Sequence, residues 1–307
     1  MTLDECEQHF AAIRASVAED EVQTHLRILL DTYPVMSFEL GRGSVFWRGR
    51  KTGIEPYANI SHMSYPPSEL AALGRLNNPG QPCLYAATRR STVLTELGVV
   101  EGDYIQLIGF RVKPHHKLRV VAIGELFHVY KTGYTKSLGT DPGNALSRTL
   151  NAAGLDRGTK VVYVDAFLGN LLSDRNARDS SYVATRLLAS LAYQKSGADG
   201  LFYPSVQDHV GMNVALLPGQ YDSATHPVCC QFVRITKVRD FGFFDSEILL
   251  EATNIGNAGE IEWAVPKAQN VTTFVGLTKR EHDFITTKAR PDGNAFLDLV
   301  NLHQNER

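Results

Sequence analysis

The chain is poor in cysteine, and the few cysteines it has are scattered. Four occur among 307 residues, Cys6, Cys83, Cys229 and Cys230, and none forms a C-x-x-C pair. The adjacent Cys229 and Cys230 would point to opposite faces of a strand, which disfavours a shared metal. We therefore expect reduced, buried thiols that pack as small apolar side chains, and neither a disulfide framework nor a zinc site.

An excess of one charge and long apolar runs are also missing. The formal net charge is -2, so no basic field favours nucleic acid or an anionic membrane as a partner. No apolar stretch approaches the ~20 residues that cross a bilayer. The first residues lack the basic and apolar regions of a signal peptide. These absences predict a cytoplasmic protein without a membrane or nucleic-acid partner.

What is present is typical of a soluble globular protein, with 43% apolar and 21% charged residues. The spacing of apolar residues predicts amphipathic helices over 3–18, 21–31 and 182–195, the second ending before Tyr33-Pro34 and the third at Gly197. Stretches rich in β-favouring residues predict strands at 44–48, 83–87, 104–112, 117–123, 200–203, 212–217 and 230–238.

The remaining segments complete the expected organisation. We expect mostly loop over 55–82, a loop-rich segment over 131–160, a turn at Pro114 between two paired strands, and a short helix after an N-cap at Ser91. Short strands and a helix near 279–287 are expected after Arg239. Because strands dominate without strict alternation with helices, the class is α+β, with a strand-rich mixed sheet core flanked by helices. The expected division is a helical extension over 1–40, a core domain over 41–238 and a C-terminal extension over 239–307.

Four polar residues stand out as candidate functional groups. Arg75, Tyr85 and Glu96 follow one another at intervals of 10 and 11 residues, and Ser205 comes far downstream after Tyr203-Pro204. A cation, an aromatic ring, a carboxylate and a hydroxyl are the groups needed to hold a charged nucleotide and break a glycosidic bond in it. Each also has a structural explanation: Arg75 or Glu96 as a solvated surface residue, Tyr85 as core, Ser205 as part of a turn.

The order of short motifs resembles the RES domain, a family named for its Arg, Glu and Ser. The similarity covers roughly residues 44–220 and rests on these segments: Phe46-Trp47-Arg48, Gly74-Arg75-Leu76-Asn77, Leu84-Tyr85, Thr92-Val93-Leu94-Thr95-Glu96, Ala198-Asp199-Gly200-Leu201-Phe202-Tyr203-Pro204-Ser205 and Gly211-Met212-Asn213-Val214-Ala215-Leu216. Leu76 departs from the aromatic residue usual at that place. The resemblance implies a fold like that of the ADP-ribosyltransferases, and an enzyme that degrades NAD⁺ and acts as a toxin or effector.

The resemblance also implies roles for individual residues. Arg75, Tyr85, Glu96 and Ser205 would be catalytic. The nucleotide would in addition contact three further residues of the motifs: Arg48, Asn77 and Asn213. NAD⁺ would be the substrate, without a metal, because the nicotinamide leaving group is already a cation. A cognate antitoxin or immunity protein is an expected partner, and assembly into a homo-oligomer stays open.

Chemistry from first principles agrees with these roles. Cleavage of the nicotinamide–ribose bond passes through a species like an oxocarbenium ion, which a carboxylate such as Glu96 stabilises. An arginine fork matches phosphate oxygens, as Arg75 and Arg48 would. The ring of Tyr85 can stack on the cationic nicotinamide. The hydroxyl of Ser205 can hold the carboxamide or ribose.

Several activities from different classes fit the sequence less well or stay open. Ser205, Asp208 and His209 lack the G-x-S-x-G turn of serine hydrolases. No G-x-G-x-x-G or Walker A run occurs, and the histidines lack ligand spacing. The acceptor of the ADP-ribose group stays undecided between water, phosphate and a protein side chain; the last would make the chain a mono-ADP-ribosyltransferase. A non-catalytic nucleotide-binding module and a pure interaction protein that uses its N-terminal helices also stay open.

Overall fold

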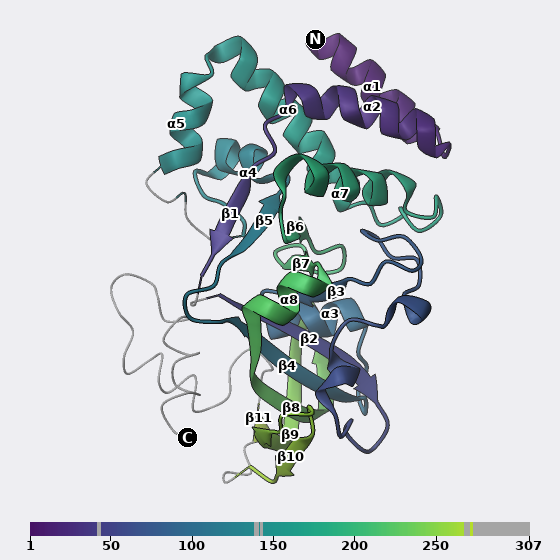
Figure 1. Cartoon of the computed structure of the whole chain (residues 1–307), viewed down its shortest axis with the longest axis vertical. Coiled ribbons are helices and arrows are strands. Elements are labelled where there is room, and N and C mark those ends of the chain that lie inside the picture. The colour runs from purple at the N-terminus through teal and green to yellow at the C-terminus, as the bar shows by residue number, and fades with distance from the viewer. Residues whose placement is uncertain (42–43, 138–140, 142–143, 267–270, 273–307) are drawn as a thin grey trace. The chain divides into compact units, whose positions relative to one another are not determined.

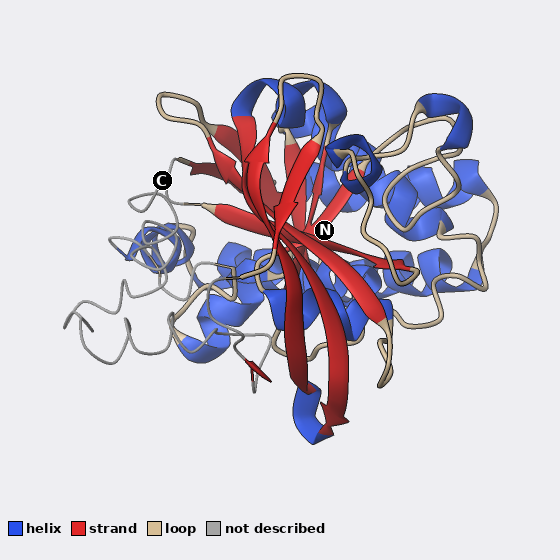
Figure 2. Ribbon diagram, turned by 90° about the horizontal axis from the view of Figure 1, so that it is seen from below, coloured by secondary structure: helices blue, strands red, loops and turns tan. Residues whose placement is uncertain are grey.

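The computed structural model describes residues 1–41, 44–137, 141, 144–266 and 271–272. Coloured by secondary structure, it shows many helices and long strands joined by loops (Figure 2). Strand pairings are both parallel and antiparallel, so the α+β class with a mixed, strand-rich sheet is confirmed. The chain divides into two compact units, each built from segments that are distant in sequence.

Unit 1 comprises Met1–Glu39, Pro67–Cys83 and Leu118–Leu217. Its strands run in the order β1-β5-β6-β7, with β5 parallel to β6 and β6 antiparallel to β7. Its elements are labelled in Figure 1: α1 (Leu3–Ala15), α2 (Glu19–Thr32), β1 (Ser37–Leu40), a 3₁₀ turn η2 (Ser68–Leu70), β5 (Leu118–Ala122), α4 (Glu125–Thr132), α5 (Ala145–Ala152), α6 (Leu155–Leu172), α7 (Val183–Ser196), β6 (Gly200–Pro204) and β7 (Met212–Leu216).

The predicted N-terminal helices are confirmed as α1 and α2. Thr2 caps α1 through a capping box with Glu5. The two helices lie side by side (Figure 1), with α1 packing on α6 and α2 on α7. Phe10 stacks on Phe167 with 3.9 Å between ring centroids. Their apolar stripes therefore belong to the core of unit 1.

A buried carboxylate joins three segments of unit 1. Asp165 of α6 is fully buried. Its carboxylate accepts hydrogen bonds from the Tyr33 hydroxyl (2.5 Å), the Gly124 amide (2.8 Å) and the Phe127 amide (2.8 Å). Burial raises the pKa of Asp165 to about 6, although its three donors favour the ionised form. Burial and the neighbouring Asp165 also raise the pKa of the Tyr33 hydroxyl.

A close backbone approach lies one helical turn further along α6. A Cβ atom on Gly169 would lie 2.9 Å from the Cα atom of Gly124. Gly124 itself has a φ of 88°, a conformation that favours glycine. Helix α6 therefore lies directly against the turn between β5 and α4, with Asp165 bonding the same turn.

Unit 2 comprises Leu40–Pro66, Leu84–Lys117 and the described residues from Pro218 on. Its strands run antiparallel in the order β3-β2-β4-β8-β9-β10, and β11 also pairs with β9. The elements are β2 (Val45–Thr52), a 3₁₀ turn η1 (Ile60–Met63), β3 (Leu84–Ala87), α3 (Arg90–Leu97), β4 (Tyr104–Val112), α8 (Pro218–Ala224), β8 (Thr225–Arg239), η4 (Asp240–Gly242), β9 (Phe243–Ile255), β10 (Ile261–Ala264) and β11 (Val271–Thr272).

Most sequence predictions of elements are confirmed, including the strand over Tyr104–Val112 and the helix that ends at Gly197. The four cysteines are free and buried, as expected. Within the described ranges, every helix is too short or too polar to cross a lipid bilayer. The helix predicted near 279–287 lies outside the described residues.

Three local predictions are wrong. The strands over 104–112 and 117–123 do not pair, because β4 has β2 and β8 as neighbours while β5 pairs in parallel with β6. The segment 131–160, expected to be loop-rich, holds α5 and the first residues of α6. Its glycines obscure the helical pattern, and packing on the rest of unit 1 stabilises these helices.

The third wrong prediction is the N-cap at Ser91. The N-cap is Arg89, so helix α3 begins two residues earlier than predicted, and it has no side-chain cap. The guanidinium of the buried Arg90 lies 4.1 Å above the ring of Trp47. Burial of this cation–π pair fixes where the helix begins, and it outweighs the preference of serine for the capping position.

We predict that Asp165→Asn lowers the free energy of unfolding by about 1–3 kcal/mol, because the asparagine NH₂ group would face a buried donor. Urea denaturation measures the change. The control is Asp156→Asn on the same helix, whose exposed carboxylate pairs with Lys160. A change of at most about 0.5 kcal/mol is expected there. Equal effects of the two variants would contradict the role of Asp165.

The carboxyl group of Asp165 also makes a pH-dependent contribution to the free energy of unfolding. Its folded-state pKa of about 6 lies above the ordinary value, so the contribution is full below about pH 4 and is lost as pH rises through 6. The difference in unfolding free energy between wild type and Asp165→Asn should therefore shrink from pH 4 to pH 7. A difference that grows over this range would show that Asp165 is stabilised in its ionised form.

Candidate functional site

Arg75 lies in the loop before β3 and is held by α6 and α7. Its Nη1 donates to the backbone carbonyls of Leu172 (3.2 Å) and Asp174 (2.9 Å) at the C-terminal end of α6. Its own carbonyl accepts from the hydroxyl of Thr185 on α7 at 2.6 Å. The guanidinium lies 5.4 Å from the centroid of the Tyr182 ring. Within the described part of the chain, Nε and Nη2 carry no hydrogen bond, so they are available for an anion.

Asn77 shapes the same loop. Its Nδ2 donates to the carbonyls of Ala72 (2.9 Å) and Asn78 (3.0 Å), and its own carbonyl accepts from the Gly74 amide at 3.2 Å. Asn78 in turn accepts a hydrogen bond from Arg186 of α7. The role that these contacts show for Asn77 is to fix the loop that carries Arg75.

Ser205 and Asn213 come from the two strands that end unit 1. Ser205 follows β6 and is buried, and its Oγ accepts from the amide of Asp208 at 2.9 Å. This bond shapes the loop back to β7 and orients a hydroxyl group that is both donor and acceptor. Asn213 is buried on β7, opposite Tyr203 of β6. The strand pair therefore places Ser205 and Asn213 at the same end of unit 1.

Arg48, Tyr85 and Glu96 belong to unit 2. Arg48 on β2 donates from Nη1 to the carbonyl of Tyr85 on β3 at 2.7 Å, which ties these strands together. Glu96 is exposed on α3, whose other face packs into the core through Val93 and Leu94. The helix lies so close to β2 that a Cβ atom on Gly49 would be 2.7 Å from Val93. This close packing fixes the position of the helix and directs Glu96 to solvent.

The structure adds candidates that the sequence did not indicate. In unit 1, the guanidinium of Arg75 lies over the ring of Tyr182. Tyr182 has a φ of 56°, and its neighbour Ser181 has a φ of 54°. Two consecutive residues in this conformation are strained, and such strain is common at functional sites. Lys136, whose Nζ donates to the His209 carbonyl at 3.2 Å, lies beside the loop after Ser205. Burial lowers the pKa of its ammonium group.

In unit 2, an aromatic cluster lies near Arg48. Tyr221 packs edge-on against Tyr65 and Phe110. A hydrogen bond to Asp222 raises the pKa of the Tyr65 hydroxyl to about 12. Burial raises the pKa of Tyr221, and the charge of Arg48 opposes that shift. No local motif marks these tyrosines, because they come from a loop and a short helix that are distant in sequence.

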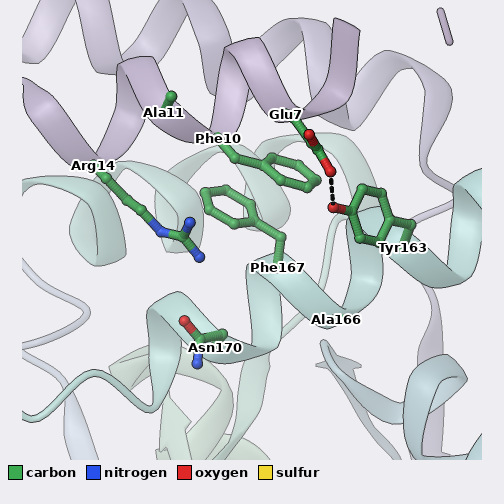
Figure 3. Close-up of a pocket in the computed structure, with 8 residues that line it drawn as sticks. All are labelled: Glu7, Phe10, Ala11, Arg14, Tyr163, Ala166, Phe167 and Asn170. Carbon is green, nitrogen blue, oxygen red and sulfur yellow. Dashed lines mark hydrogen bonds between the residues drawn. The ribbon is translucent and has the colours of Figure 1, made fainter. Parts of the chain in front are cut away.

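Three cavities that the structure shows are lined by residues other than these candidates. One lies between α1 and α6, where Phe10 and Phe167 stack between Arg14 and Tyr163 (Figure 3). A second lies among α4, α5 and α6, and a third at the base of the β8–β9 hairpin. Among the described residues, no group of three or more His, Cys, Asp or Glu could hold a metal ion.

These features define an α+β protein with a tethered arginine loop and an exposed carboxylate on a short helix. A family model of the RES domain matches residues 46–235, and the chain belongs to this family. The predicted resemblance is thereby confirmed. The RES domain is associated with NAD-related toxin and effector functions. Searches of curated proteins and of solved structures gave no match.

We predict that Arg75→Ala loosens its loop and lowers the free energy of unfolding by about 1 kcal/mol, since two hydrogen bonds to carbonyls are lost. Hydrogen–deuterium exchange should rise at residues 74–78 and 172–174. Arg175→Ala, which removes an exposed arginine in the adjoining loop, is the matched control and should leave exchange unchanged. Unaltered exchange in Arg75→Ala would contradict the tether.

Proposed function

We propose that this protein consumes NAD⁺ by cleaving its nicotinamide–ribose bond, and that it acts as a toxin or effector in the cytoplasm. The observation that carries the proposal is the family match over residues 46–235. This range contains all seven residues that the sequence marked, including the Arg, Glu and Ser for which the family is named. In its simplest form the reaction converts NAD⁺ and water into nicotinamide, ADP-ribose and a proton.

Glu96 is the proposed stabiliser of the transition state. As the nicotinamide leaves with the bonding electron pair, positive charge develops on the ribose, and a carboxylate nearby lowers the energy of that state. Helix α3 is fixed by its core contacts while Glu96 is exposed to solvent. Such a group needs no rearrangement before reaction, which favours electrostatic catalysis.

The two arginines are proposed to bind the pyrophosphate. Arg75 is already oriented by carbonyl oxygens on Nη1, which leaves its Nε and Nη2 edge for a bidentate contact with phosphate. Arg48 is oriented in the same manner by the Tyr85 carbonyl. Orientation before binding reduces the entropy lost when the substrate is held.

The remaining residues are proposed to position the two ends of the glycosidic bond. The half-buried ring of Tyr85 would stack on the nicotinamide. Ser205, oriented by the Asp208 amide, would donate its hydroxyl hydrogen to the carboxamide or ribose. Asn213 would contact the nucleotide, whereas Asn77 would act indirectly by fixing the arginine loop.

The products formed from NAD⁺ identify the acceptor of the ADP-ribose group. Purified protein is incubated with NAD⁺, with and without inorganic phosphate and with cell lysate as a source of protein acceptors, and mass spectrometry identifies the products. Free ADP-ribose indicates a hydrolase, ADP-ribose 1″-phosphate a phosphorylase, and a mass increase on lysate proteins a mono-ADP-ribosyltransferase. No release of nicotinamide by the folded protein in any arm would refute the proposed function.

We predict that Glu96→Gln lowers nicotinamide release by about 100- to 1,000-fold, the effect of removing one preorganised electrostatic contact. The unfolding midpoint should stay unchanged, because the side chain is exposed. Glu101→Gln, in the turn after α3, is the matched control and should keep wild-type turnover.

Expression of the active protein should also deplete cellular NAD⁺ and slow growth, while Glu96→Gln should do neither.

A further inference from the structure

A strained and fully exposed phenylalanine lies at the end of the β8–β9 hairpin. The amide of Phe243 donates to the carbonyl of Asp240, and the two residues between them, Phe241 and Gly242, have φ values of 62° and 75°. Turns of this kind favour Asn-Gly, because a bulky side chain with positive φ is strained. Phe241 is nevertheless 96% exposed, so its ring gains no packing against the described residues that could offset the strain.

Further apolar side chains flank the turn. Phe243 is 51% exposed and Val238 is 41% exposed, and they lie on opposite faces of the hairpin, because Phe243 pairs with Arg239 and Val238 with Phe244. An aromatic anchor with apolar neighbours is typical of a contact with another protein. The whole element from Asp240 on also lies beyond the residues that match the RES domain, so the family chemistry does not explain it.

The base of the same hairpin holds a matching receptor. A cavity of about 370 Å³ opens there and is mainly apolar. Its lining residues include Ile60, Val228, Ala252 and Ile255. This volume can accommodate a phenylalanine side chain. The turn and the cavity lie at opposite ends of the hairpin. About ten residues of each strand separate them, which corresponds to about 35 Å at the rise of an extended strand.

Charges near the two ends are complementary. Lys237 is exposed near the turn and lies opposite Asp245 on the hairpin. Asp245 pairs with Arg239, and the ammonium group of Lys237 has no hydrogen bond or ion pair of its own within the described part of the chain. Glu260 is exposed beside the cavity, where its carboxylate would lie 2.8 Å from a Cβ atom on the lining residue Gly256. A hairpin that approached a second hairpin in the opposite direction would bring these charges together.

We propose that two copies of this chain form a closed dimer, in which Phe241 of each copy enters the cavity at the base of the partner's β8–β9 hairpin. Two-fold symmetry supports this arrangement, because antiparallel hairpins make the same contact twice and leave neither turn nor cavity unused. Figure 1 shows β8 and β9 as a long strand pair, and the two-fold axis of the dimer would run perpendicular to these strands.

The test measures assembly across a concentration series by light scattering after gel filtration and by sedimentation velocity. Wild type should reach twice the single-chain mass. Phe241→Asn should raise the dissociation constant by at least about 30-fold, the effect of losing a central aromatic anchor. The same substitution relieves turn strain, so the unfolding midpoint should rise by about 2–4 °C. Ile54→Asn, which removes another exposed apolar side chain of unit 2, should leave the dimer intact.

Two further variants locate the contact. In a background in which serine replaces Cys229 and Cys230, which also line the cavity, mixing Phe241→Cys with Asn257→Cys should give a disulfide between copies under oxidation, while neither variant alone should do so. Lys237→Glu should raise the dissociation constant by about fivefold through repulsion of Glu260, and adding Glu260→Lys should restore it. A monomeric wild type, a larger open assembly, or a dimer that survives Phe241→Asn would overturn the proposal. None of these readouts depends on NAD⁺ turnover.

Discussion

The carboxylate of Asp165 is the interaction on which unit 1 depends. It lies in the interior of the unit, and it bonds the end of α2 and the turn before α4 to the middle of α6. Taking a carboxylate out of water is expensive, so the arrangement is favourable only while all three donors are in place. The glycine contact one turn later leaves α6 no room to shift against that turn.

The candidate site inherits this rigidity. The C-terminal carbonyls of the same helix hold Arg75, so the position of the arginine follows from the position of Asp165 two helical turns earlier. In unit 2 the equivalent element is α3, which lies on β2 at the place where only glycine fits. In unit 1, therefore, a closely packed helix holds the charged group of a neighbouring loop, and in unit 2 a closely packed helix carries a charged group itself.

Local pattern was sufficient to predict much of the fold. Residues of α1, α2 and α7 repeat at helical spacing, and β4 is a continuous run of β-favouring residues, so each element was recognised with nearly correct bounds. The pairing of the strands could not be predicted in this way, because β6, the partner of β5, comes about 80 residues later and local sequence does not encode that choice. Helix α3 begins where Arg90 packs on Trp47, a contact that no capping rule anticipates.

The site followed a similar division. Arg75, Glu96 and Ser205 could be proposed from the sequence because the motifs that carry them are contiguous, whereas the further candidates Tyr182, Tyr221 and Lys136 come from segments without a motif. Their environment is created by the tertiary structure alone. Asn77 shows the converse, since a residue placed in a motif turns out to bond its own loop.

The hydroxyl of Tyr33 has a consequence for how this protein can be shortened. The residue precedes the segment that matches the RES domain, yet it donates one of the three hydrogen bonds to Asp165. A fragment that begins at the family boundary would lack that donor and the apolar stripe of α2. The Asp165 carboxylate would then miss a hydrogen bond, and the interior that α2 covers would be exposed. The smallest autonomously folding piece of this protein is therefore larger than the homology that identifies it.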